Sequence, residues 1–180
     1  KDKKGNELSI LGFGCMRFAR KGGKIDIEEA EREIMEAYHA GVNYFDTALY
    51  YCHSNSEITI GKALKPIRDK VYISTKCPLE LVKEPGDFEK ILDVSLGRLG
   101  TDYVDFYHFW GINKDKFDNI LMPQDLLKEP AQLKEEGLIR HISFSFHDHP
   151  SAIKHIVDTA EHHGVKMESM LCQYNLLDRS

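Results

Sequence analysis

The chain has 180 residues, 42% hydrophobic and 29% charged, a composition typical of one soluble globular domain. The formal net charge of −5 gives no basic footprint for nucleic acid, and no apolar run approaches the ~20 residues that span a membrane. The polar start lacks the apolar core of a signal peptide. Four cysteines without CxxC spacing argue against a metal cluster within the chain. We therefore expect a cytoplasmic protein with neither a nucleic-acid nor a membrane partner.

The first part of the chain predicts a strand followed by a capped helix. The strand is expected at residues 8–14 and ends at Gly14. Asp26 is the expected N-cap of the helix, because Glu29 three residues later completes a capping-box pattern. Gly41 ends the helix.

Strands and helices then alternate along the rest of the chain. Further strands are expected at 42–46, 71–76, 103–110, 138–145 and 167–173. Helices are expected at roughly 56–65, from Asp87 to Gly100, and from Pro150 to Gly164. A broken helical stretch is expected after residue 122, with Pro130 at the first position of its second piece and Gly137 at its end. Residues 111–122 are expected to be a loop of mixed charge.

The spacing of these strands indicates repeated βαβ units. Strand starts recur about every 30 residues, the length of one such unit. The alternation predicts an α/β fold with a parallel sheet covered by helices. A doubly wound sheet and a (β/α)8 barrel both fit this periodicity, and the absence of GxGxxG at a strand-to-helix turn lowers the Rossmann alternative.

Three polar residues lie at or just beyond the ends of two neighbouring strands. Asp46 ends one strand, Tyr51 follows five residues later, and Lys76 ends the next strand. A lysine cation held by Asp46 would lower the pKa of Tyr51 from about 10 and make it a general acid. Each residue also has a simpler interpretation: a turn residue for Asp46, a packed aromatic for Tyr51 and ordinary surface for Lys76.

Segments spread over nearly the whole chain resemble the aldo/keto reductase family. They are 11–17 (LGFGCMR), 43–48 (NYFDTA) through Tyr51, 56–57 (SE), 73–76 (ISTK), 98–107 (RLGTDYVDFY) and 173–177 (QYNLL). The resemblance implies a (β/α)8 TIM barrel. Such a barrel needs ~250 residues, so residues 1–180 are expected to be a single barrel domain truncated at its C-terminal end, with about six strands and five helices. Some relatives carry a Cys-rich iron–sulfur region further on, and an iron–sulfur cluster is expected only in such a missing region.

The resemblance also assigns roles to residues. It implies that Tyr51 moves the proton, that Lys76 lowers its pKa, and that Asp46 holds Lys76. It implies NADP(H) as the hydride donor, with NAD left open. The residues that match cofactor-binding positions are Cys15, Met16, Asp46, Ser145 and Gln173, and those that match the substrate pocket are Tyr50 and Trp110.

Two positions depart from the family pattern. Trp110 stands where the family has a His, and His108 lies ~6–7 Å deeper on the same strand face. We expect His108 to be a buried, hydrogen-bonded core residue. Ser145 is followed by Phe146 in place of the usual Asn. Simpler interpretations are that Ser145 caps a turn and that Cys15 and Met16 belong to the core.

The sequence thus predicts an NAD(P)H-dependent oxidoreductase that interconverts a small aldehyde or ketone and an alcohol. The alternative is a reductase-like barrel acting as a cofactor-sensing binding or regulatory subunit, which the Trp110 substitution favours. A third reading is a truncated product without function.

Overall fold

The computed structural model describes residues 7–175, so the end of the segment 173–177 lies outside the described residues. Six strands form a sheet in chain order, β1-β4-β5-β6-β7-β8. Strand β1 pairs with β4, β4 with β5 and β7 with β8, each in parallel. The bounds are Phe13–Gly14, Tyr44–Asp46, Tyr72–Pro78, Val104–Ile112, Ile139–Phe146 and Ser169–Cys172. The expected α/β fold with a parallel sheet is confirmed.

The chain divides into two compact units. The first comprises the described residues up to Thr75 together with Val94–Asp105, and the second comprises Lys76–Asp93 together with the described residues from Phe106. Helix α4 (Asp87–Leu99) and strands β5 and β6 contribute residues to both units.

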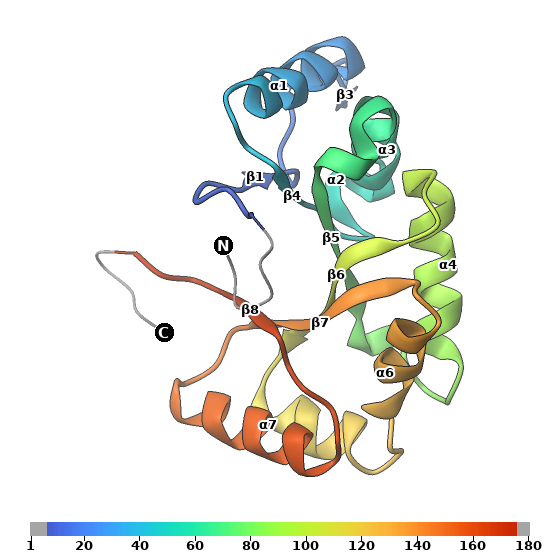
Figure 1. The fold of residues 1–180 in the computed structure, drawn as a ribbon, viewed down its shortest axis with the longest axis vertical. Helices are drawn as coiled ribbons and strands as arrows, with labels where there is room; N and C mark the ends of the chain where they lie inside the picture. The colour runs from blue at the N-terminus through green and yellow to red at the C-terminus, as the bar shows by residue number, and fades with distance from the viewer. Residues whose placement is uncertain (1–6, 176–180) are drawn as a thin grey trace. The chain divides into compact units, whose positions relative to one another are not determined.

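In the first unit, helix α1 (Ile27–His39) begins and ends as the sequence predicts. The Asp26 side chain accepts a hydrogen bond from the Glu29 N–H, and Gly41 follows the helix with φ of 96°. Ala30 and Ile34 are its buried residues. Figure 1 shows α1 near helix α3 (Ser56–Leu64), which leads into the 3₁₀ segment Lys65–Lys70.

Position 61 on α3 has to be glycine, because the backbone of α3 lies against the backbone of Leu99 there. A Cβ at this position would lie 2.3 Å from the Leu99 carbonyl oxygen at the end of α4, a distance that no side chain tolerates. The glycine therefore sets how closely α3 meets the end of α4 within the first unit.

The structure contains a hairpin that the sequence analysis missed. The expected strand at 8–14 is reduced to Phe13–Gly14, and a separate antiparallel pair follows, β2 (Arg20–Lys21) with β3 (Lys24–Ile25). Gly22 and Gly23 join them with φ of 59° and 80°. A Gly-Gly pair is a recognised signal for such a two-residue turn, but the flanking strands are too short and too polar to show a strand pattern.

In the second unit, two predictions from the sequence are wrong. Residues 111–122 are not a simple loop, since they include α5 (Lys114–Lys116) and the π-helical turn Phe117–Leu121. Phe117 and Leu121, one turn apart, are fully buried, which explains why this polar stretch folds. Pro130 is the third residue of α6 (Lys128–Glu135), where its missing N–H still lies in the first turn.

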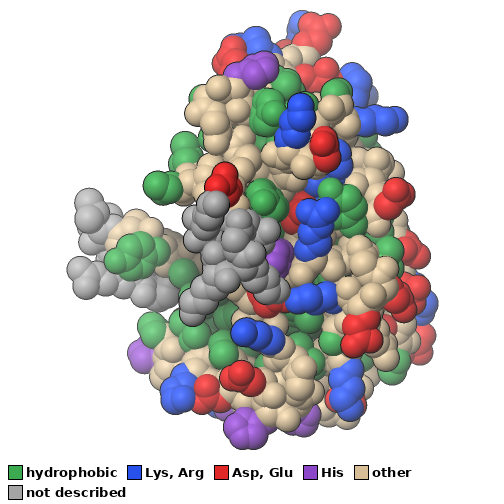
Figure 2. Space-filling view, viewed as in Figure 1, with side chains coloured by type: hydrophobic (Ala, Val, Ile, Leu, Met, Phe, Trp, Pro, Cys, Tyr) green, Lys and Arg blue, Asp and Glu red, His purple; other side chains and the backbone are tan. Residues whose placement is uncertain are grey.

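Helix α7 (Ser151–His162) has one buried and one solvated face. Ala152, Ile156 and Ala160 are buried, and Gly164 follows with φ of 79°. Figure 2 shows basic, acidic and His side chains mixed over this end of the structure. His162 and His163 are exposed, as a solvated helix end requires. No helix among residues 7–175 is long and apolar enough to cross a membrane.

A buried charge cluster fixes the start of β6 in the first unit. The Asp105 side chain is fully buried and accepts hydrogen bonds from Arg68 Nη2 and the Ile73 N–H, both at 2.9 Å. Arg68 also donates to the Tyr103 carbonyl, and its guanidinium lies 4.1 Å from the Tyr103 ring centroid. The guanidinium thus balances a carboxylate that has no access to water.

We expect Asp105→Ala to reduce the free energy of unfolding by about 3 kcal/mol, because it leaves the Ile73 N–H and the Arg68 cation without their shared acceptor. Urea denaturation followed by circular dichroism measures the change. Asp102→Ala removes an exposed carboxylate three residues away and is the matched control. Equal losses in the two variants would contradict this account.

Candidate active site

The register of three parallel strands brings Asp46 to the carboxyl end of the sheet. Asp46 pairs with Gly14 on β1 and with Ser74 on β5. The Ser74 hydroxyl donates a 2.5 Å hydrogen bond to Asp46 Oδ1, and the Cys15 N–H donates to the Asp46 carbonyl at 2.8 Å. Both the carboxylate and the backbone of Asp46 are therefore fixed from the neighbouring strands, at the edge where parallel α/β folds place their sites.

Tyr51 follows Asp46 through a short buried connection and lies half-buried. Thr47, Ala48 and Leu49 are buried, which anchors the segment before the tyrosine. Burial, and secondarily the Asp46 charge, raise the pKa of Tyr51 to about 12. This corrects the expected lowering of the Tyr51 pKa within the first unit, because a partly desolvated phenol beside a carboxylate favours its neutral form.

The backbone turns left-handed immediately after Tyr51. Cys52, His53 and Ser54 have φ of 55°, 54° and 64°, at a cost of roughly 1–2 kcal/mol for each residue that is not glycine. Hydrogen bonds to the turn offset this cost: Cys52 Sγ donates to the Met16 carbonyl at 3.1 Å, and Asn55 Nδ2 donates to the His53 carbonyl at 2.8 Å. The turn is thus tied to the segment that follows β1.

Lys76 lies on β5 two residues after Ser74, so both side chains are on the same face of the strand. Its side chain is fully buried, which is rare for lysine unless the ammonium has partners. Lys76 is the first residue of the second unit, whereas Asp46 and Tyr51 belong to the first. The ion pair between Lys76 and Asp46 stays a prediction.

A buried hydroxyl network connects the ends of β1 and β4 to the start of α3. Ser56 Oγ lies 2.7 Å from both the Cys15 carbonyl oxygen and Thr47 Oγ1. The Thr47 N–H donates to the Ser74 carbonyl at 2.9 Å. These bonds hold the residues that flank Asp46 and leave little freedom to the chain that leads to Tyr51.

A second buried network, which the sequence did not predict, is built on Glu57. This carboxylate accepts from Thr75 Oγ1 at 2.7 Å and pairs with Arg98 at 3.4 Å. Arg98 also donates to the Leu49 carbonyl at 2.9 Å, two residues before Tyr51. Glu57 and Arg98 lie in segments whose resemblance to the family was noted, but a buried charge cannot be recognised from spacing.

The second unit holds the residues expected to meet the nicotinamide. Ser145 on β7 is buried, and its hydroxyl accepts a 2.7 Å hydrogen bond from the Gly111 N–H at the end of β6. Ser145 therefore joins two strand ends and does not cap its own turn. Gln173 is exposed just beyond β8, two residues after Leu171, the register partner of Ser145.

The remaining predicted residues differ in exposure. Cys15 is fully buried, as a core residue would be, whereas Met16 and Tyr50 are 51% and 44% exposed. Trp110 is half-buried and His108 is buried, as expected for His108. Within residues 7–175 no group of three or more His, Cys, Asp or Glu side chains is placed to hold a metal ion.

Comparisons with known proteins match the chain to one family. The sequence profile described as "Aldo/keto reductase family" matches residues 10–180. The chain is 34% identical over 149 residues to the L-galactose dehydrogenase of Arabidopsis thaliana, and 30% identical over 195 residues to the NADH-specific methylglyoxal reductase of Escherichia coli. An aldo-keto reductase from Bacillus halodurans, solved in its holo form, matches with a TM-score of 0.78 and 31% identity.

These comparisons place the chain in a class and then in a family. The class is the (β/α)8 barrels, of which this chain forms an incomplete example with six strands of the sheet. The chain belongs to the aldo/keto reductase family. It covers about half the length of these relatives: 46% of the Arabidopsis protein, 57% of the Escherichia protein and 55% of the Bacillus structure. In turn 78%, 96% and 96% of this chain is matched.

We expect Glu57→Ala to reduce the free energy of unfolding by about 3 kcal/mol, because it leaves the Thr75 hydroxyl and the Arg98 cation without their common acceptor. Thermal and urea denaturation measure this loss. Glu135→Ala, at an exposed position of α6, is the control. A Glu57 variant as stable as this control would show that the network does not stabilise the folded protein.

Proposed function

We propose that this chain provides the proton-transfer residues and part of the cofactor site of a nicotinamide-dependent carbonyl reductase. The observation that carries this proposal is the carboxylate of Asp46, fixed by Ser74 at a strand end and close enough to Tyr51 to raise its pKa. A barrel enzyme places its chemistry at this end of its strands. The proposal assigns Tyr51 as the acid in reduction and the base in alcohol oxidation.

The residues of the second unit fit a nicotinamide carboxamide, which has both a donor and an acceptor. Since the Ser145 hydroxyl oxygen accepts from Gly111, its own hydrogen remains to donate to the carboxamide oxygen. The exposed Gln173 amide supplies a further donor and acceptor. The bound cofactor would supply the hydride, and Met16 and Cys15 would line its inner side.

The cofactor we propose is NADP(H), on the family resemblance, with NADH as the competing choice. The Escherichia relative is named an NADH-specific reductase, and the chain matches 57% of that protein. The names of the two curated relatives differ in substrate, one a sugar and one methylglyoxal. We therefore propose a small carbonyl compound as the substrate class.

In the proposed reaction, Tyr51 keeps its proton until the carbonyl oxygen develops negative charge. Its raised pKa guarantees that the phenol is protonated near neutral pH. Proton transfer also requires that the phenolate be stabilised as it forms. We assign this to Lys76, whose ammonium would offset burial and the Asp46 charge, while Asp46 would hold the ammonium in place.

Tyr51→Phe should lower the turnover number for carbonyl reduction by 10²–10⁴-fold in order of magnitude, because the ring remains and only the proton donor is lost. The affinity for the nicotinamide cofactor should change little. Steady-state kinetics and fluorescence titration with the cofactor measure the two quantities. Tyr38→Phe on α1 is the matched control, and unchanged turnover in the Tyr51 variant would exclude the tyrosine as the acid.

The pH dependence of kcat/KM tests the role of Lys76. An acid catalyst is active while protonated, so kcat/KM is constant below its pKa and falls as the pH rises through it. In the unsubstituted protein, burial and the Asp46 charge raise the Tyr51 pKa to about 12, and we propose that the Lys76 cation limits this rise. The decline in Lys76→Met should therefore lie at higher pH than in the parent, with a lower plateau. The control is Lys70→Met, at an exposed position just before β5, which should leave the pH profile of kcat/KM unchanged. An unshifted pH profile for Lys76→Met would contradict the role assigned to Lys76.

A second candidate is a cofactor-sensing subunit with slow catalysis, favoured by the half-buried Trp110 where the family has a His. An imidazole there would donate to the substrate oxygen, whereas indole is bulkier and has a single N–H. Trp110→His should raise the turnover of small aldehydes by up to about 10²-fold if the parent is slow for lack of this donor. If the Trp110→His variant is slower on every aldehyde of a panel, the unsubstituted protein is not slow for lack of an imidazole donor, and this argument for the second candidate fails.

A further inference from the structure

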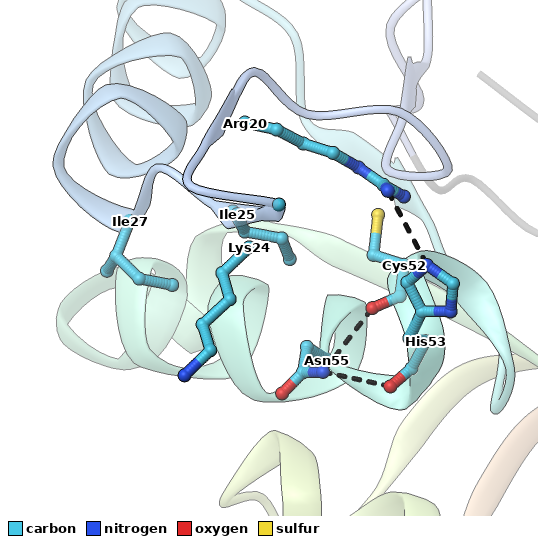
Figure 3. Close-up of a pocket in the computed structure, with 8 residues that line it drawn as sticks. Arg20, Lys24, Ile25, Ile27, Cys52, His53 and Asn55 are labelled. Atoms are coloured by element: carbon cyan, nitrogen blue, oxygen red, sulfur yellow. Dashed lines mark hydrogen bonds between the residues drawn. The ribbon is translucent and has the colours of Figure 1, made fainter.

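A cavity of about 330 Å³ lies in the first unit beside the left-handed turn that follows Tyr51. Figure 3 shows the side chains around it, which come from the β2–β3 hairpin, the start of α1 and the 52–55 segment. The lining residues are Arg20, Gly23, Lys24, Ile25, Ile27, Cys52, His53 and Asn55. Two of them are cations and none is a carboxylate.

The positive charge is concentrated in the hairpin. The hairpin Arg20–Ile25 carries three basic side chains and no acidic one, in a chain whose net charge is −5. Lys21 and Lys24 are register partners across the hairpin, and like charges directly opposite each other destabilise a strand pair. A two-stranded hairpin is marginally stable by itself. Its charge is therefore a cost to folding that an anion in the cavity would offset.

The two cations of the cavity have donors left for a ligand. Among residues 7–175 neither Arg20 nor Lys24 forms an ion pair with a carboxylate, whereas Arg32 and Lys62 of the same unit do. Arg20 Nη1 lies 3.5 Å from His53 Nε2. The carboxylate of Asp26 accepts from the Glu29 N–H at the start of α1 and does not line the cavity.

We propose that this cavity binds the acidic group, carboxylate or phosphate, of the carbonyl substrate. The planar guanidinium of Arg20 suits two-point recognition of such a group, and Lys24 lines the same cavity with a second cation. Ile25 and Ile27 provide apolar contact for the body of the ligand. This inference rests on the proposed function, because it adds a substrate class to the reaction assigned to Tyr51.

Cys52 places the cavity next to the candidate active site along the chain, although Tyr51 itself does not line it. Cys52 lines the cavity, follows Tyr51 directly in the chain, and donates to the Met16 carbonyl at 3.1 Å. The adjacent Cys15 N–H donates to the Asp46 carbonyl. The left-handed turn thus forms a wall of the cavity one residue from the proposed acid, and its backbone strain is offset by these contacts.

The first experiment measures anion binding without catalysis. Isothermal titration at constant ionic strength uses inorganic phosphate as the probe, with the parent, the double variant Arg20→Gln/Lys24→Gln, and Lys21→Gln as control. Lys21 has the same charge in the same hairpin but does not line the cavity. We expect the dissociation constant to rise at least about tenfold in the double variant and less than about twofold in the control. Equal losses in both variants, or no loss in either, would overturn the anion site.

The second experiment compares 4-carboxybenzaldehyde with benzaldehyde as substrates of the same three proteins. The parent should prefer the acid, and the double variant should lose about tenfold in kcat/KM on the acid and almost nothing on benzaldehyde. An unchanged preference, with both aldehydes reduced, would overturn the substrate assignment and leave the proposed function standing. If neither aldehyde is reduced while phosphate binding still depends on Arg20 and Lys24, the proposed function fails and the anion site stands.

Discussion

The candidate site depends on the register of three parallel strands. Gly14, Asp46 and Ser74 are register partners on β1, β4 and β5, so the Asp46 carboxylate receives the Ser74 hydroxyl at 2.5 Å. A slip of one residue would turn Asp46 to the opposite face of the sheet. The hydroxyl network around Thr47 and the buried Glu57 extend this constraint from the strands to the helix start that follows Tyr51.

Elements with strong periodicity could be predicted from the sequence, whereas those shaped by burial could not. The cap of α1 at Asp26 and the parallel strands follow from local patterns. The hairpin at 20–25 and the helical turns at 114–121 were missed, because the hairpin strands have two residues each and the turns are held by buried Phe117 and Leu121. Local polarity carried no information about that burial.

In the candidate site, too, features set by local sequence could be predicted and features set by burial could not. Asp46, Tyr51 and Lys76 became candidates because their spacing resembles a family, and their joint role stays a prediction. The direction of the Tyr51 pKa shift could not be predicted. Burial and the proximity of Asp46 raise this pKa, and both are properties of three-dimensional placement. Glu57 and Arg98 likewise look like ordinary helix charges until the burial of Glu57 and the hydrogen bond from Arg98 to the Leu49 carbonyl are known.

Our central proposal is that Asp46, Tyr51 and Lys76 act together in proton transfer, and a double-mutant cycle on kcat/KM tests it most directly. If Asp46 acts by holding Lys76, then Asp46→Asn should cost much less when Lys76→Met is already present. The two losses should then fail to add by about 1 kcal/mol or more. Losses that add within about 0.5 kcal/mol would show that the two residues act independently, and would contradict the account.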